Sequence, residues 1–168
     1  MAALKLAPVA ALAAAAAVFA GWSGYSWYAA AHATTVTYGT ARDEALTAGR
    51  TLVTELTTLD YHDVNGGLGK WLSASTGPLH DQLASTDETT KKTLAANATV
   101  ATGRVVDAGL SELDEHAGTA KLLASVEITM AKQGTAPAVK RNRFAAALSR
   151  TPDGWKLSAL DQLPVGAR

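Results

Sequence analysis

A long run without charge near the start of the chain constrains the fold more than any other feature. No Asp, Glu, Lys or Arg occurs between Leu6 and Ala31, a stretch of 26 positions, and 15 of the first 33 residues are alanine. About 20 apolar helical residues cross the roughly 30 Å hydrocarbon core of a bilayer. The run therefore predicts a transmembrane helix over residues 6–31, with residues 1–5 as a cytoplasmic stub.

Four aromatic residues gather at the far end of this run. Amphipathic rings favour the headgroup level of a bilayer, so these residues are expected at the membrane interface: Trp22, Tyr25, Trp27 and Tyr28. Lys5 and the amino terminus are positive before the run, whereas Arg42 is followed at once by Asp43 and Glu44. This bias favours a single-pass plasma-membrane protein with a cytoplasmic amino terminus and an extracytoplasmic domain over residues 32–168.

A cleaved signal peptide is an alternative interpretation of the same segment. Its apolar region would be residues 6–20, and Ala31-His32-Ala33 matches the small-residue pattern of a cleavage site. A buried helix of a soluble protein is a third alternative. The aromatic cluster between the apolar region and the cleavage pattern favours the uncleaved anchor, and both of the first two interpretations export the remainder.

Small residues recur every four positions along the predicted anchor. They would lie on neighbouring faces of the helix, and five of them are candidates for packing against another membrane helix: Ala16, Ala17, Ala20, Gly21 and Gly24. The high alanine content of the segment accounts for the same pattern without any function.

The residue counts exclude several kinds of chemistry. The chain has no cysteine, which excludes disulfides, thiolate metal sites and a cysteine nucleophile. Its four histidines show no metal-binding spacing, and we expect no metal and no cofactor. Lys plus Arg equals Asp plus Glu at 15 each, which argues against binding nucleic acid.

Beyond the apolar run, the sequence predicts an α+β domain. Apolar residues recur at a helical period from Ala41 to Thr58, Pro78 suits the first turn of a helix, and Asp87 is placed to cap a helix over 88–96. Asn65-Gly66-Gly67 is typical of a turn. Four strand patterns follow, at 100–110, 119–130, 139–148 and 155–160, with Thr151-Pro152-Asp153-Gly154 as a hairpin turn. Helices followed by an antiparallel meander predict α+β architecture, and a strongly bent sheet would form a cone.

The order of these parts resembles a known family. The features are one membrane helix, a leading helix, Leu59-Asp60-Tyr61, the Thr76-Gly77-Pro78 break, residues 105–109, and a final Asp153-Gly154-Trp155 turn and strand before Leu163-Pro164-Val165. Over nearly the whole chain, this looks like the Mce-associated membrane proteins of actinobacteria, where Mce stands for mammalian cell entry. The resemblance implies a nuclear transport factor 2-like or SnoaL-like domain. It also implies an accessory role in Mce transporters, which import lipids or sterols across the cell envelope.

The resemblance implies partners as well: the membrane, other membrane proteins of a transport complex, and a lipid ligand. Inner-membrane scaffolds of type IV secretion share the same general plan, so a secretion-like scaffold is an alternative function. A third is an enzyme like ketosteroid isomerase that uses Asp60 as base and Tyr61 as donor. Adjacent residues at a helix end do not face one another, so we expect Asp60 to cap and His62 and Asp63 to face water, with no catalytic residue.

Charge and aromatic residues supply the last two candidate sites. Residues 107–127 hold five acids against Lys121, and seven basic residues follow from Lys132 onward against Asp153 and Asp161. Attraction between neighbouring strands explains this pattern, and a docking patch of Lys140, Arg141 and Arg143 is the alternative. The large aromatics would line either the core or a lipid pocket: Tyr61, Trp71, Phe144 and Trp155.

Overall fold

A computed structural model describes residues 6–164, with the side chains of residues 6–18 and 30–37 left out. The chain divides into two compact units, Met1–Thr40 and Ala41–Arg168. The predicted stub over residues 1–5 lies outside the described residues, as do the side chains of Ala16 and Ala17.

The first helix, α1, spans Leu6–Leu56 and belongs to both units. In the first unit its four predicted interface aromatics are exposed, and a side chain added at Gly21 or Gly24 would meet nothing within 4 Å. Among the residues whose side chains are described, 19–29 and 38–164, no helix combines the length and the apolar character that a membrane span requires. In the second unit, α1 confirms the helix predicted from Ala41, and it ends two residues before Thr58.

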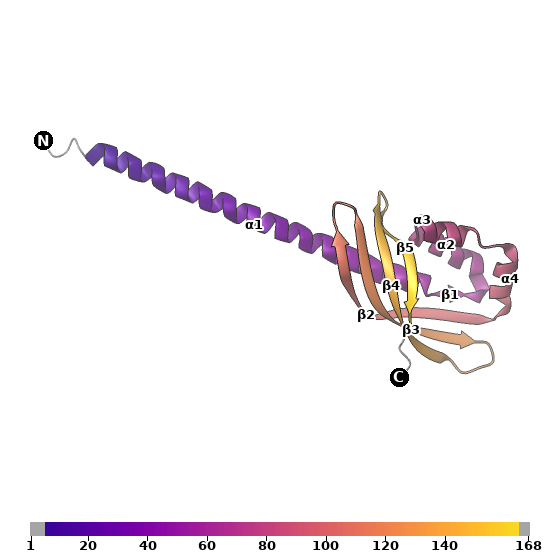
Figure 1. The fold of residues 1–168 in the computed structure, drawn as a ribbon. Coiled ribbons are helices and arrows are strands. Elements are labelled where there is room, and N and C mark those ends of the chain that lie inside the picture. The colour runs from indigo at the N-terminus through magenta and orange to yellow at the C-terminus, as the bar shows by residue number, and fades with distance from the viewer. Residues whose placement is uncertain (1–5, 165–168) are drawn as a thin grey trace. The chain divides into compact units, whose positions relative to one another are not determined.

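Three short helices and a single turn of 3-10 helix follow α1, and Figure 1 shows α2, α3 and α4 close to β1. They are η2 (Tyr61–Asp63), α2 (Val64–Ala74), α3 (Gly77–Ala84) and α4 (Glu88–Ala96). Pro78 occupies the first turn of α3 as predicted. Asp87 caps α4 as predicted, because its carboxylate accepts a hydrogen bond of 2.7 Å from the Thr90 amide.

The turn predicted at Asn65-Gly66-Gly67 is wrong, because these residues form the first part of α2. The Asp63 carboxylate accepts a hydrogen bond of 2.9 Å from the Gly66 amide and so caps the helix. A side chain at Gly67 would collide with Leu59 of β1. The glycines therefore permit close packing inside a helix here, rather than marking a turn.

The sheet is an antiparallel meander in the order β1-β2-β3-β4-β5. The strands are β1 (Leu59–Asp60), β2 (Thr99–Asp114), β3 (Thr119–Lys132), β4 (Ala138–Thr151) and β5 (Gly154–Leu163). The four predicted strands are confirmed, each somewhat longer than expected, whereas β1 was not predicted. The Thr151–Gly154 hairpin is confirmed too, with Gly154 at a φ of 104°.

Two bulges shift the register of β2 against β3. They lie between Val105 and Asp107 and between Leu110 and Glu112, next to the glycines at 103 and 109. Bulges bend a strand and increase its twist, and Figure 1 shows the long strands curving along their length.

The core lies between the inner face of the sheet and the part of α1 in the second unit. Alternate residues of β3 face inward there, and the side chains with the least exposure are Leu122, Leu148, Leu157, Val53 and Val126. A side chain added at Gly49 of α1 would come within 3.1 Å of Leu122. Glycine thus lets the helix lie close to the sheet, and the α+β prediction is confirmed.

Candidate functional site

The corner that links β1 to α2 holds the acidic and aromatic cluster seen in the sequence. Asp60 ends β1, and its carboxylate accepts hydrogen bonds from the amide of His62 at 2.9 Å and from His62 Nδ1 at 2.7 Å. These bonds lower the pKa of Asp60, the backbone amide being the main cause. Asp63 caps α2 in the same way. Both carboxylates therefore hold the backbone of this corner, as carboxylates at helix starts commonly do.

A cleft of about 420 Å³ lies beside this corner. Its walls are polar at several points, and the residues that form it are Thr54, Glu55, Thr58, Leu59, Asp60, Asp63, Gly67 and Lys70. Tyr61 is not among them, since its ring stacks on His62 with centroids 3.9 Å apart. A base and a donor that act on one substrate must reach the same atoms. The pair Asp60 and Tyr61 does not converge on this cleft.

Trp71 fastens this corner to the end of α1. Its Nε1 donates to the Glu55 carbonyl at 2.9 Å and to the Thr58 carbonyl at 3.1 Å. The last carbonyls of a helix have no partner within the helix. The Glu55 carbonyl also accepts from the Thr58 amide at 3.1 Å, and the indole adds a second donor to it. Trp71 is therefore a structural residue of the corner.

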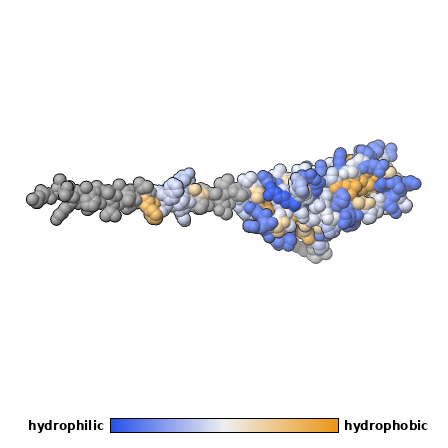
Figure 2. Space-filling view, turned by 90° about the horizontal axis from the view of Figure 1, so that it is seen from above, coloured by the Kyte–Doolittle hydropathy of each residue, from blue (hydrophilic) through white to orange (hydrophobic). Residues whose placement is uncertain are grey.

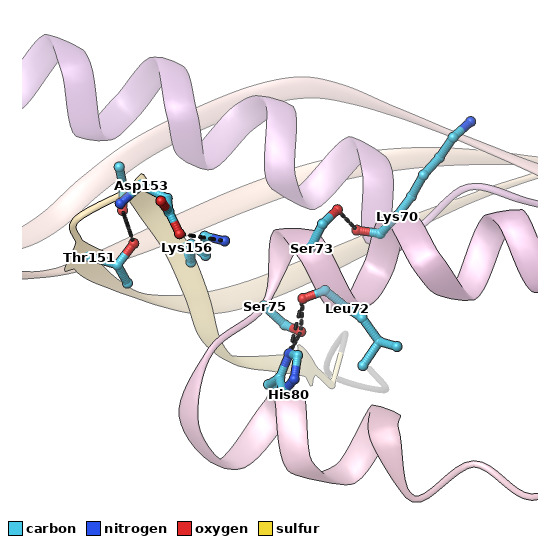
Figure 3. Close-up of polar contacts among 9 residues, drawn as sticks. Lys70, Leu72, Ser73, Ser75, His80, Thr151, Asp153 and Lys156 are labelled. Carbon is cyan, nitrogen blue, oxygen red and sulfur yellow. Dashed lines mark hydrogen bonds and ion pairs between the residues drawn. The ribbon is translucent and has the colours of Figure 1, made fainter.

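A serine and a histidine meet where α2 turns into α3 (Figure 3). Ser75 is 3% exposed, and its Oγ lies 3.5 Å from His80 Nδ1. His80 Nδ1 also lies 3.0 Å from the Leu72 carbonyl, and the Ser75 hydroxyl donates to the same carbonyl at 3.2 Å. A carbonyl only accepts, so Nδ1 carries a hydrogen and cannot take the proton of Ser75. The contact fixes the bend between the helices and does not activate a nucleophile.

The same bend is tied to the sheet. The amide of Thr76 donates to the Leu157 carbonyl at 2.8 Å, and Ser75 forms a parallel bridge with Leu157. Leu157 is fully buried on β5. The Ser75–His80 contact therefore positions α3 against the core.

The four candidate pocket aromatics do not lie together around one cavity. Phe144 is part of the buried core, and Trp155 packs against that core with Arg150 over its ring at 5.9 Å. Tyr61 and Trp71 belong to the corner described above. Within residues 6–164, Trp155 Nε1 is a buried donor with no hydrogen-bond partner. These residues are thus spread through the domain.

The basic residues of β4 lie on two sides of the sheet. Arg141 is opposite Glu127, Arg143 is opposite Ser125, and Lys140 is opposite the inward position Ile128. Side chains alternate along a strand, which places Lys140 on the face opposite to Arg141 and Arg143. Glu127 accepts from Arg104 at 2.9 Å and from Arg141 at 3.2 Å.

Those contacts lower the pKa of Glu127, the hydrogen bond from Arg104 being the main cause. The predicted attraction between neighbouring strands is therefore present. The docking patch remains a prediction for the two residues that share a face, Arg141 and Arg143.

Metal binding has no support in the described part of the chain, where no group of three His, Asp or Glu side chains could hold an ion. The cleft at Asp60 is lined by three acids and one lysine, and its two best-placed carboxylates already bond to amides. No cofactor-binding pattern is visible in that arrangement.

A family model described as "Uncharacterized protein Rv1363c/MT1408-like" matches residues 5–164. No curated protein sequence matches the chain. The match covers both the charge-free run and the α+β domain.

Solved structures with a similar fold include proteins of bacterial type IV secretion systems. An IcmL-like type IV secretion system protein from Legionella pneumophila has a TM-score of 0.61 at 11% identity, over 76% of this chain and 95% of its own. The periplasmic domain of DotI has a TM-score of 0.59 at 12% identity, over 71% and 93%. CagV, a VirB8 homologue from Helicobacter pylori, has a TM-score of 0.54 at 8% identity, over 71% and 96%. The domain therefore has the nuclear transport factor 2-like and VirB8-like fold, as predicted.

Proposed function

The chain belongs to the Rv1363c/MT1408-like family, and we propose that it is a non-enzymatic scaffold subunit of a complex in the bacterial cell envelope. One anchor, the charge-free run over residues 6–31, holds it in the plasma membrane. The α+β domain lies outside the cytoplasm and binds other proteins of the complex.

The apolar core between α1 and the sheet is the observation that carries this proposal. Five large side chains with less than 2% exposure occupy the space between α1 and the sheet. A fold of this type acts as an enzyme through a cavity with convergent polar groups. Here the carboxylates at Asp60 and Asp63 cap helices, and the Ser75–His80 contact fixes a bend. The surface is what remains available for function.

An Mce-type lipid or sterol importer is the complex that the sequence resemblance favours. The resemblance rests on the order of the parts along nearly the whole chain, from the membrane run to the Asp153-Gly154-Trp155 strand. In such a complex, the subunit would hold other membrane proteins together and meet lipid at their interface. Its own domain needs no enclosed lipid cavity for that role.

A secretion-like apparatus is the second candidate, and the structural comparisons favour it. The similar structures include type IV secretion proteins and the periplasmic domain of DotI. At 8–12% identity, this likeness concerns the fold. A scaffold role is common to both candidates, which differ in the proteins that are held together.

Purification of the full chain in mild detergent, with identification of co-purifying proteins and lipids, tests the proposal. Mce proteins and a permease among the partners would support the importer, and a secretion ATPase or channel would support the second candidate. The matched control is Asp60→Asn with Tyr61→Phe, which removes the groups of the enzyme hypothesis and leaves the surface elsewhere unchanged. Recovery of the chain alone would contradict both candidates.

A further inference from the structure

The outer face of the sheet, which points away from α1, carries an exposed leucine in the middle of β3. Even-numbered residues of β3 from Ala120 to Val126 are buried in the core, so odd-numbered residues point outward. Leu123 is one of these, and it is 49% exposed in the middle of its strand. Small residues flank it at the same level, Gly109 on β2 and Ala145 on β4. Small side chains on both sides of Leu123 allow a second surface to approach the sheet closely.

Two clefts lie along the strands, one on each side of the level of Leu123. One, of about 410 Å³, is formed in part by Asp107, Leu123, Arg143 and Leu163. The other, of about 450 Å³, is formed in part by Glu112, Lys121, Ala147 and Ser149. Leu123 therefore stands as an apolar ridge beside hollows in the outer face. Figure 2 shows one side of the domain, where hydrophobic residues form only small patches among hydrophilic ones.

Charges on this face are paired at both ends and unpaired in the middle. At one end Glu127 binds Arg104 and Arg141, and at the other Lys121 lies 2.9 Å from Glu112. Three charges lie between these pairs: Asp107, Arg143 and Asp161. Within residues 6–164, the structure gives none of the three an ion pair. The unpaired charges thus surround the exposed leucine.

Charges of opposite sign lie on the two strands that flank β3. Asp107 on β2 and Arg143 on β4 are both opposite Ser125, so they stand at the same level. Two strand spacings, about 10 Å, separate their backbones, and the structure shows no ion pair between the two side chains. A two-fold axis along β3 exchanges the β2 side with the β4 side. It therefore brings the Arg143 of one copy over the Asp107 of the other, twice.

We propose that the middle band of this outer face, defined by Asp107, Gly109, Leu123, Arg143, Ala145 and Asp161, binds the same band of a second copy. An interface between identical patches must be self-complementary. Two symmetric ion pairs around a pair of apolar ridges meet that requirement. The outer faces of two sheets then pack against each other, as in a sandwich, about 10 Å apart.

The size of the band predicts a weak dimer. The face between the two ion-paired ends spans four strands and the seven residues of β3 from Lys121 to Glu127, about 19 by 23 Å, or roughly 400 Å² on each copy. Stable interfaces bury about 800 Å² on each partner, so dimers form only at high concentration. Anchoring of both copies in one membrane would supply such a concentration.

Crosslinking of single-cysteine variants tests the contact, since the natural chain has no cysteine. Facing backbones about 10 Å apart exceed the reach of a disulfide, so the probe is a short bis-maleimide on the full chain in detergent. Leu123→Cys is expected to give a covalent dimer. The control is Val139→Cys, which is more exposed at 57% and lies on the same face outside the band. Equal crosslinking of the two variants would indicate random collision and overturn the proposal.

Sedimentation velocity of the uncrosslinked full chain supplies a second test. Arg143→Asp should raise the dimer dissociation constant about tenfold, because it breaks two symmetric ion pairs and creates like-charge contacts. Adding Asp107→Arg to the same chain should restore the dimer. A chain that stays monomeric at its highest soluble concentration would overturn the proposal. So would a dimer that Arg143→Asp and Leu123→Lys leave unchanged, because another surface would then hold it.

Discussion

The indole nitrogen of Trp71 donates a hydrogen bond of 2.9 Å to the carbonyl of Glu55, across 16 positions of sequence. Glu55 lies in the last turn of α1, and Trp71 lies in α2. The contact adds a second donor to a carbonyl near the end of α1 that also accepts from the Thr58 amide. It also holds α2 against the corner where the chain leaves α1 for the sheet.

Trp71→Phe should therefore destabilise the domain by about 1–2 kcal/mol, because an aromatic ring is kept while the carbonyls of Glu55 and Thr58 lose the indole donor. The matched control is Trp155→Phe, which removes a buried Nε1 that has no partner within the described residues. That change should cost less, since it removes an unsatisfied polar group. Urea unfolding followed by circular dichroism measures both, and equal losses would contradict the assigned role of Trp71.

Gly103→Ala should be strongly destabilising, by about 2–3 kcal/mol, because the new methyl group would collide with Thr57 at the end of α1. Gly109→Ala, in the same strand, places its methyl group where nothing lies within 4 Å. It should change the free energy of unfolding by less than about 0.5 kcal/mol. The comparison of the two urea midpoints isolates close packing from strand propensity, and similar midpoints would refute the contact.

Asp87→Asn should reveal a pH-dependent contribution of the α4 cap. The hydrogen bond from the Thr90 amide lowers the pKa of Asp87 in the folded chain. Its stabilisation is then complete above the usual carboxyl pKa of about 3.9, and it is lost as the pH falls through the lowered folded value. Asparagine keeps the cap and removes the charge.

The melting temperature of the wild type should exceed that of Asp87→Asn at pH 6, and the difference should disappear in strong acid. Asp81→Asn, an exposed change in α3, serves as the control for nonspecific charge effects. A difference that is constant from pH 6 into strong acid would show that the carboxylate charge has no part in the cap.

Local chemistry made much of the fold predictable. Pro78 and Asp87 each act only on the first turn of the helix that they begin. The Thr151–Gly154 hairpin likewise needs only four residues. Apolar residues also alternate along β3, because one side of the strand is buried against α1. Each of these signals lies within a single element.

Contacts between distant elements were not predictable in the same way. Gly66 and Gly67 suggested a turn, and only the positions of Asp63 and Leu59 show why a helix needs glycine there. The strand at Leu59–Asp60 is two residues long and is defined by its pairing with Val100 and Ala101. The role of Trp71 in the candidate site could not be predicted either, because the carbonyl of Glu55 that accepts its hydrogen bond lies in another helix.

The outer band of the sheet depends on register. The bulge between Val105 and Asp107 moves Asp107 to the outer face, beside Ser125, where regular alternation would not place it. The sequence showed that acidic and basic residues lie in different strands. It could not show that Glu127 forms ion pairs with both Arg104 and Arg141. The unpaired charges in the middle follow only from that geometry.

Co-purification from the native membrane tests the central claim most directly. A scaffold acts through its surface, so the full chain and the Asp60→Asn, Tyr61→Phe variant should recover the same envelope proteins in the same amounts. Both should also restore function to cells that lack the natural chain. If the chain recovers no partner, and the variant alone fails to restore function, the protein acts through the chemistry of that corner and the scaffold account is wrong.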